Sequence, residues 1–170
     1  HFTLKNIVPF DLGLTLDCGQ AFRWSITEDD CFEGIAMGKY LKIKQNGSDL
    51  VFYNTTEAEF KNIWQGYFDL ERDYNEILNR AKQNELLLKI TENCGGIRLL
   101  RQDPWEALCS FIISQNNNIP RIKGIINRLC ENFGEKIDGG YTFPPAERLK
   151  DLSIDDLSVL RAGFRAKYIL

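Results

Sequence analysis

The sequence predicts an α+β fold, in which a domain of strands and helices is followed by a helical region. An alternating apolar and basic run, residues 41–44, and an apolar run, residues 50–53, flank an Asn-Gly pair, and this arrangement is typical of a β-hairpin. After residue 103 the apolar side chains recur every three or four positions, which is the period of a helix. A Gly-Gly pair separates the two patterns, so we expect one domain over residues 1–95 and the beginning of another over 96–170.

More elements are predicted within the first domain. Residues 22–26 and 31–35 favour an earlier strand pair joined by an acidic turn. Thr56 and Glu59 have the spacing of a capping box, so a helix is expected to begin there. Two further helices are expected over residues 73–82 and 85–92.

The second region begins with a clear helix start. Asp103 is a good N-cap and Pro104 fits the first helical turn. The apolar stripe that follows is interrupted over residues 114–118, after which a second helix is predicted to end before Gly134. A later helix start is expected at Asp155 and Asp156.

The composition narrows the class of protein. The chain has 170 residues, of which 44% are hydrophobic and 26% charged, and these values fit a globular protein rather than a disordered or fibrous one. No segment approaches the roughly 18–20 apolar residues of a membrane span, and the first ten residues do not resemble a signal peptide. We therefore expect no membrane partner and an intracellular location.

The cysteines and the histidine exclude several kinds of site. The five cysteines include no Cys-x-x-Cys pair, and the number is odd, which argues against a disulfide framework or a zinc knuckle. The one histidine is His1, so neither a Ser-His-Asp triad nor a histidine-rich metal site can be built.

The charge is unevenly distributed. A net charge of −3 argues weakly against a nucleic-acid partner. However, residues 107–130 and 157–170 contain only basic charges, and local basic stripes matter more for phosphate binding than the total does. Such stripes are also common on solvated helix faces, so both interpretations remain open at this point.

Three consecutive asparagines, residues 116–118, lie between the two predicted helices. Composition alone favours a turn in which Asn118 caps the next helix. A functional interpretation is also open, because amides can mimic a base edge and a helix N-terminus with Arg121 nearby can hold phosphate. An enzyme that flips a base out of a duplex needs both properties. Near the C-terminus, Phe164 beside Arg165 has the character of an aromatic wedge next to a cation.

Taken together, four stretches in order resemble the 8-oxoguanine DNA glycosylases of the helix-hairpin-helix superfamily. The matching segments span residues 19–168. They are Gly19-Gln20-Ala21-Phe22-Arg23-Trp24, Leu99-Leu100-Arg101-Gln102-Asp103-Pro104, Gln115-Asn116-Asn117-Asn118-Ile119-Pro120-Arg121-Ile122 and Gly163-Phe164-Arg165-Ala166-Lys167-Tyr168. The resemblance implies an antiparallel sheet domain with helices, followed by the start of an all-α helix-hairpin-helix glycosylase domain.

The resemblance also implies a role for individual residues. The carbonyl of Gly19 would read the damaged base, because oxidation at C8 converts the N7 acceptor of guanine into an N–H donor. Asn116 would fill the space left by the flipped base, Arg121 and Arg165 would contact the orphaned cytosine, and Phe164 would be the wedge. We also expect Asn117 to bind DNA. The implied partner is double-stranded DNA containing 8-oxoguanine, bound by a monomer in the cytoplasm or nucleoid of a bacterium or the nucleus of a eukaryote. The implied mechanism requires no metal and no organic cofactor.

Two positions depart from the family pattern. Phe164 stands where tyrosine is usual in animal members, and Gln115 replaces a serine. Loss of the hydroxyl at position 164 removes a hydrogen bond near the orphaned base, so we expect a weaker preference for cytosine opposite the lesion.

In the family, a catalytic lysine attacks the sugar C1′, expels the base and forms a Schiff base that permits strand cleavage. The family's lysine and aspartate follow the region that matches Tyr168, and Lys167 aligns with a family arginine. No catalytic residue is therefore expected in this chain, and both catalytic residues are expected beyond Leu170. We interpret the chain as an inactive piece of a longer base-excision repair enzyme.

Several alternatives remain open. The chain could belong to a related glycosylase for alkylated bases, which would share the fold but not the Gly19 and asparagine segments. It could also be a non-catalytic DNA-binding module, or a structural helical domain without a nucleic-acid role.

Overall fold

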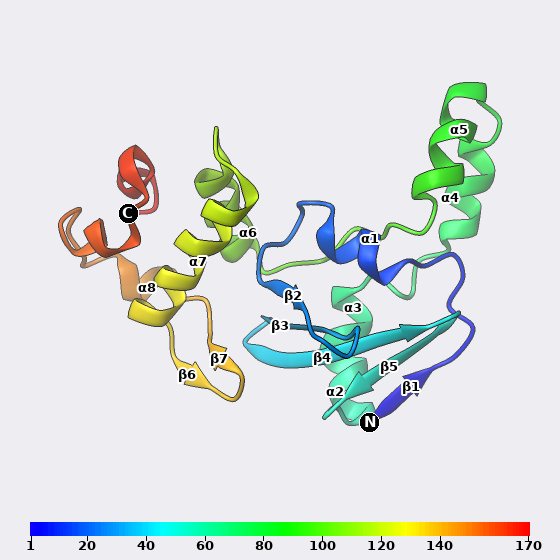
Figure 1. The fold of residues 1–170 in the computed structure, drawn as a ribbon, viewed down its shortest axis with the longest axis horizontal. Coiled ribbons are helices and arrows are strands. Elements are labelled where there is room, and N and C mark those ends of the chain that lie inside the picture. Colours follow the sequence, from blue (N-terminus) through cyan, green and yellow to red (C-terminus); the bar gives the residue numbers. More distant parts are fainter. The chain divides into compact units, whose positions relative to one another are not determined.

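The computed structural model describes residues 1–170 and divides into two compact units. The first unit comprises residues 1–20, 26–32 and 41–101, and the second comprises 21–25, 33–40 and 102–170. Two short segments before residue 95 therefore belong to the second unit. The expected α+β class is confirmed, because a five-stranded sheet and helices are both present (Figure 1).

The sheet has the strand order β1-β5-β4-β3-β2. Its strands are β1 (Phe2–Leu4), β2 (Trp24–Ile26), β3 (Phe32–Ala36), β4 (Lys39–Asn46) and β5 (Asp49–Tyr53). The predicted hairpin is confirmed as β4 and β5, which pair antiparallel with Asn46 opposite Asp49. The two turn residues are therefore Gly47 and Ser48, so Asn46 ends the strand rather than lying within the turn.

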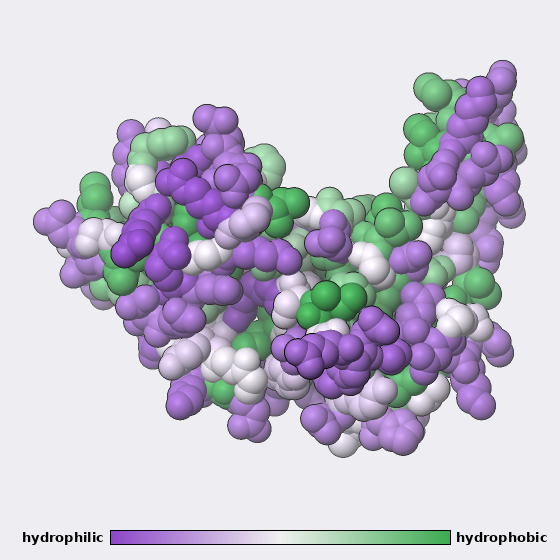
Figure 2. All heavy atoms as spheres, viewed as in Figure 1, coloured by the Kyte–Doolittle hydropathy of each residue, from purple (hydrophilic) through white to green (hydrophobic).

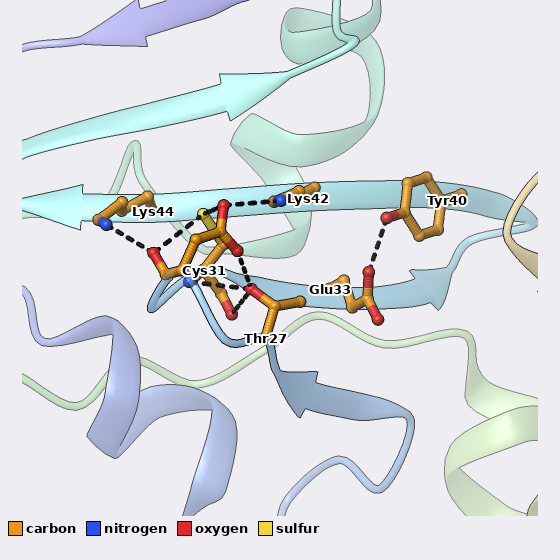
Figure 3. A network of polar contacts seen from close by, with 7 residues as sticks. Thr27, Cys31, Glu33, Tyr40, Lys42 and Lys44 are labelled. Carbon is orange, nitrogen blue, oxygen red and sulfur yellow. Dashed lines mark hydrogen bonds and ion pairs between the residues drawn. The ribbon is translucent and has the colours of Figure 1, made fainter.

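The two faces of the hairpin differ because side chains alternate along a strand. Leu41, Ile43, Leu50 and Phe52 are fully buried. On the other face, the Lys42 amine lies 2.9 Å from the Asp29 carboxylate and the Lys44 amine donates to the Asp29 carbonyl at 2.7 Å. Figure 3 shows these contacts, together with the Thr27 hydroxyl that donates to the same carboxylate. Hydrogen bonds from Thr27 and Lys42 lower the pKa of Asp29, and the network attaches the turn before β3 to β4.

The helices of the first unit mostly follow the sheet in the sequence. They are α1 (Leu12–Asp17), α2 (Glu57–Glu59), a π-helical turn (Phe60–Trp64), α3 (Gln65–Tyr67), α4 (Tyr74–Ala81) and α5 (Glu85–Cys94). The Thr56 hydroxyl accepts from the Glu59 N–H at 3.2 Å, as the capping pattern predicts. α1 was not predicted, because it is only six residues long and has no sustained periodicity. Figure 2 shows apolar side chains at the surface of the α4–α5 segment, where Leu86 and Ile90 are exposed.

The second unit is mainly helical. It contains α6 (Pro104–Ser114), α7 (Ile119–Phe133), β6 (Lys136–Ile137), β7 (Gly140–Tyr141), α8 (Ala146–Leu149) and two 3-10 helices (Asp156–Leu160 and Gly163–Tyr168). The helix expected at Asp155 and Asp156 is thus a short 3-10 helix. The buried core of this unit consists mainly of Cys109, Ile113, Ile122, Ile125, Ile126, Leu129, Leu149, Leu157 and Leu160. No helix of the molecule is both long enough and apolar enough to cross a bilayer.

Candidate nucleic-acid interface

The loop between α6 and α7 separates the three asparagines into different roles. Asn118 caps α7, since its side-chain oxygen accepts from the Arg121 N–H at 3.0 Å. The Asn117 amide donates to the Ile113 carbonyl at 3.0 Å, and its oxygen accepts from the Asn118 N–H. These two side chains therefore hold the loop in place. DNA binding by Asn117 remains a prediction, and in the structure its amide serves the loop.

Asn116 is the asparagine whose side chain is free. It is exposed and its amide has no hydrogen-bond partner in the protein. Its backbone is in the left-handed region, with φ of 47°, a conformation that asparagine tolerates better than most residues. An amide presented in this way offers both a donor and an acceptor to an external group.

Arg121 lies in the first turn of α7 and is also exposed. Its backbone N–H is used by the cap, but its guanidinium has no partner in the protein. A helix N-terminus favours anions because its first N–H groups have no partner within the helix. Asn116 and Arg121 thus present an amide and a cation from the same short loop and helix start.

The segment that ends the chain adds an aromatic side chain to this unit. Gly163 has φ of 62°, which lets the backbone turn tightly between the two 3-10 helices. Phe164 follows and is 57% exposed, which is unusual for a phenylalanine. An exposed aromatic ring on a tight turn has the properties required of a wedge between bases.

Arg165 is buried, unlike Asn116, Arg121 and Phe164. It is only 3% exposed. Its guanidinium donates to the main-chain carbonyls of Gln115 and Asn116, so the structure brings Arg165 and Asn116 together. Its contact with the orphaned base remains a prediction.

Gly19 belongs to the first unit, whereas the other five predicted site residues belong to the second. Its φ is 85° and it is exposed just after α1. No atom lies within 4 Å of the position that a Cβ would take, so the backbone conformation, and not crowding, is what requires glycine here. The Gly19 carbonyl has no partner in the protein and is available as an acceptor.

The neighbouring Gln20 has a role that sequence reasoning missed. Its side-chain amide donates to the carbonyls of Thr15 and Arg98, each at 2.8 Å, and its oxygen accepts from the Leu100 N–H at 3.0 Å. Three bonds from one side chain therefore hold the backbone directly after Gly19. The polar residue beside the motif glycine was the only signal for this role, because the partners are main-chain groups.

The rest of the same motif serves the second unit. The Arg23 guanidinium lies 3.6 Å from the Glu106 carboxylate, and both side chains are nearly buried. Burial raises the pKa of Glu106, although the charge of Arg23 acts in the opposite direction. The Lys123 amine of α7 donates to the Trp24 carbonyl at 3.0 Å. These contacts attach Arg23 and the first residue of β2 to α6 and α7.

Comparison with known proteins decides the family. The sequence model described as "8-oxoguanine DNA glycosylase, N-terminal domain" matches residues 3–108, more than half of the chain. The chain belongs to the 8-oxoguanine DNA glycosylase family. The predicted resemblance is therefore confirmed.

Individual relatives agree with this assignment. The chain is 30% identical to the N-glycosylase/DNA lyase OGG1 of Arabidopsis thaliana in an alignment of 169 residues, with 93% of this chain and 46% of that protein covered. It is 49% identical over 81 residues to the N-glycosylase/DNA lyase of Saccharomyces cerevisiae, covering 44% of this chain and 22% of that one. The chain thus spans less than half the length of these two relatives. The expected location of the catalytic lysine and aspartate, beyond Leu170, stays a prediction.

Solved structures of the family have the same fold. The 8-oxoguanine glycosylase/lyase of Clostridium acetobutylicum in its apo-form has a TM-score of 0.93 and 44% identity, covering 98% of this chain and 60% of that one. The same enzyme bound to double-stranded DNA with cytosine opposite 8-oxoguanine also has a TM-score of 0.93. A 3-methyladenine DNA glycosylase of Archaeoglobus fulgidus shares the fold at 14% identity and a TM-score of 0.72.

Within this family member, neither buried cysteine of the helical unit is suited to be a nucleophile. Burial raises the pKa values of Cys109 and Cys130 to about 12 each. Such thiols stay protonated near neutral pH and are weak nucleophiles. They are part of the apolar core instead.

Proposed function

We propose that this chain supplies the lesion-reading part of an enzyme that removes 8-oxoguanine from double-stranded DNA in base-excision repair. The observation that carries the proposal is the exposed Gly19 carbonyl, which has no partner in the protein. Guanine presents an acceptor at N7, which a carbonyl repels, whereas 8-oxoguanine presents an N–H donor, which a carbonyl binds. One main-chain acceptor is therefore sufficient to distinguish the two bases.

The helical unit would prepare the duplex for this reading. Extruding a base costs a few kcal/mol of stacking and pairing, and groups that occupy the gap reduce this cost. The free Asn116 amide would take the place of the flipped base, while the exposed Phe164 ring would enter the stack beside it. Arg121 would bind the orphaned base or a nearby phosphate, because its guanidinium is free and exposed.

We further propose that these 170 residues do not perform the chemistry themselves, and that the catalytic lysine and aspartate of the whole enzyme follow Leu170. Expulsion of the base by a lysine requires an amine held close to the sugar. In the helical unit, the Lys123 amine is bonded to the Trp24 carbonyl, and the exposed Lys167 amine lies 4.8 Å from the centre of the Tyr168 ring. Neither amine is paired with a carboxylate that could assist it.

The test combines binding with borohydride trapping. We expect the chain to bind a duplex with 8-oxoguanine opposite cytosine more tightly than the undamaged duplex, and to form no covalent adduct on reduction. Equal binding to the two duplexes would refute lesion recognition. Tighter binding to a duplex with 3-methyladenine would favour the alkylated-base alternative.

A trapped adduct would refute the proposed inactivity, since reduction links protein to DNA only through a Schiff base. Peptide mapping of such an adduct would identify the lysine. Lys123→Gln and Lys167→Gln would then serve as a matched pair, because one amine is bonded within the protein and the other is exposed.

A further inference from the structure

The Arg165 guanidinium lies where several exposed elements of the helical unit meet. The guanidinium donates to two main-chain carbonyls at the end of α6 and in the α6–α7 loop. It also donates to the Ala162 carbonyl, three residues before Arg165. We infer that Arg165 is a positioning residue, which fixes Asn116 and Phe164 relative to each other before DNA binds. This role is additional to any base contact, and it rests on the proposed function.

Most N–H donors of the Arg165 guanidinium are used in hydrogen bonds within the protein. Nε donates to the Gln115 carbonyl at 3.0 Å, and Nη2 donates to the carbonyls of Gln115 and Asn116, the latter at 2.9 Å. Nη1 donates to the Ala162 carbonyl at 3.4 Å. A guanidinium has five N–H groups, so at most one remains for another partner.

The Arg165 guanidinium is stabilised by its place beside the C-terminus of α6. Gln115 is the C-cap of α6, and the last carbonyls of a helix have no partners within the helix. A cation beside them is stabilised by the partial negative charge at the helix C-terminus. No carboxylate forms an ion pair with Arg165, so these carbonyls are what compensates its buried charge.

The same guanidinium reaches both groups that would act on DNA. It bonds directly to the main chain of Asn116, whose left-handed conformation is otherwise unfavourable. Its carbon also lies 4.5 Å from the centre of the Phe164 ring, within the range of a cation–π contact. One planar cation thus restrains the amide that fills the gap and the ring that enters the stack.

A lysine cannot reproduce this arrangement, because its single ammonium cannot reach the same carbonyls with a planar fork. The variant Arg165→Lys therefore keeps the charge and removes the simultaneous hydrogen bonds to these carbonyls. Arg161→Lys is the matched control, since Arg161 is exposed in the same segment and its side chain forms no bond within the protein. Arg121→Gln serves as the comparison variant, because Arg121 is proposed to contact DNA directly.

The first measurement is hydrogen exchange in the protein without DNA. We expect the hydrogen-bonded amides of Gln115 and Asn118 to exchange about tenfold faster in Arg165→Lys, the effect of losing a charged hydrogen bond, and to be unchanged in Arg161→Lys and Arg121→Gln. Unchanged exchange in Arg165→Lys would overturn the inference. Because no DNA is present, this result does not depend on whether the proposed function is correct.

The second measurement is lesion binding with each of the four bases opposite. A positioning role predicts that Arg165→Lys weakens binding with all four opposite bases, whereas a base contact alone predicts a loss confined to cytosine, which would contradict the inference. If the wild-type protein does not prefer the lesion, the proposed function fails and the exchange result still stands.

Should Arg165→Lys fail to fold, the unmodified protein provides the test. The Nε–H proton of Arg165 should exchange with water much more slowly than that of the exposed Arg121, and it should remain protected when duplex is added. Equal exchange of the two protons, or loss of protection on binding, would overturn the inference.

Discussion

At the scale of single residues, neighbouring identical side chains have different roles. Asn116, Asn117 and Asn118 have the same chemistry, yet two of them are used within the loop and one is free. The difference comes from the backbone, because the left-handed conformation at Asn116 removes its side chain from the loop's own donors and acceptors. Function at this site therefore depends on conformation as much as on composition.

Asn116→Ala should weaken binding to the lesion duplex about tenfold, the value of one well-placed amide contact. Asn116→Gly, which loses the same amide but adopts the positive φ of position 116 without strain, should weaken binding similarly and leave the free energy of unfolding nearly unchanged. Titration with labelled duplex and urea unfolding would measure the two quantities. Unchanged duplex binding in both Asn116→Ala and Arg121→Ala would favour the structural helical domain without a nucleic-acid role.

Phe164 is expected to reduce discrimination at the orphaned base. A phenyl ring stacks but donates no hydrogen bond, so the preference for cytosine opposite the lesion should be weaker than with a tyrosine. Binding to lesion duplexes with cytosine, adenine, guanine or thymine opposite would measure this, and Phe164→Tyr should strengthen the preference for cytosine. Strict cytosine preference in the unmodified protein would contradict the expectation.

At the scale of elements, the helix starts are fixed by local side-chain caps. Asp103, Asn118 and Thr56 each accept a main-chain N–H three residues further along, inside the helix that follows. Such bonds need only a short stretch of chain, which is why the helix starts were predictable.

Asn118→Ala should destabilise the protein by about 1 kcal/mol through loss of the α7 cap. This variant loses stability and no DNA contact, so lesion binding should fall only to the extent that the first turn of α7 unfolds. Urea unfolding with Asn116→Gly as the matched control would show it, since both variants delete an asparagine amide and glycine adopts the positive φ of position 116 without strain. Equal stability of the two variants would refute the assigned roles.

Asp69 links the loop after α3 to two arginines. Its carboxylate lies 2.7 Å from the guanidinium groups of both Arg72 and Arg101, and it accepts from the Tyr74 hydroxyl at 2.9 Å. Burial raises the pKa of Asp69, but the hydrogen bonds from Tyr74 and Arg101 and the charges of Arg101 and Arg72 outweigh it, so the pKa is lowered overall. The charged form is thus favoured in the folded protein.

Because the folded pKa of Asp69 lies below the unfolded one, its stabilisation is complete above about pH 5 and is lost as the pH falls through the folded pKa. Asp69→Asn should cost about 3 kcal/mol at neutral pH and flatten the acid side of the stability curve. Glu57→Gln, which breaks an exposed pair with Lys61, should change both quantities little. Parallel acid profiles for Asp69→Asn and the unmodified protein would count against this assignment.

At the scale of the whole molecule, the total charge of −3 conceals a basic helical region. Phosphate binding depends on local cations and releases counterions from the DNA. The slope of its salt dependence therefore reports how many phosphates the protein contacts. We expect duplex binding to weaken with salt, and Arg121→Gln to reduce the slope of log K against log salt by about 1 if Arg121 binds a phosphate. An unchanged slope would assign Arg121 to the orphaned base instead.

The sequence by itself determined the α+β class, the β4–β5 hairpin, the caps of α6 and α7, and the family. All of these depend on residues that are close in the chain, or on motifs whose order can be read directly. Periodicity, turn residues and caps are local, so their physical causes are visible in a short window of sequence.

Only the tertiary structure decided which asparagine is free, how Gln20 holds Gly19, and why Arg165 is buried. The Arg165 bonds join residues 50 positions apart, and their acceptors are main-chain carbonyls. Every residue has such a carbonyl, so no side-chain pattern marks the partner. Contacts of this kind follow from how the elements pack, and they became known only when the fold placed the end of α6 against the turn at Gly163.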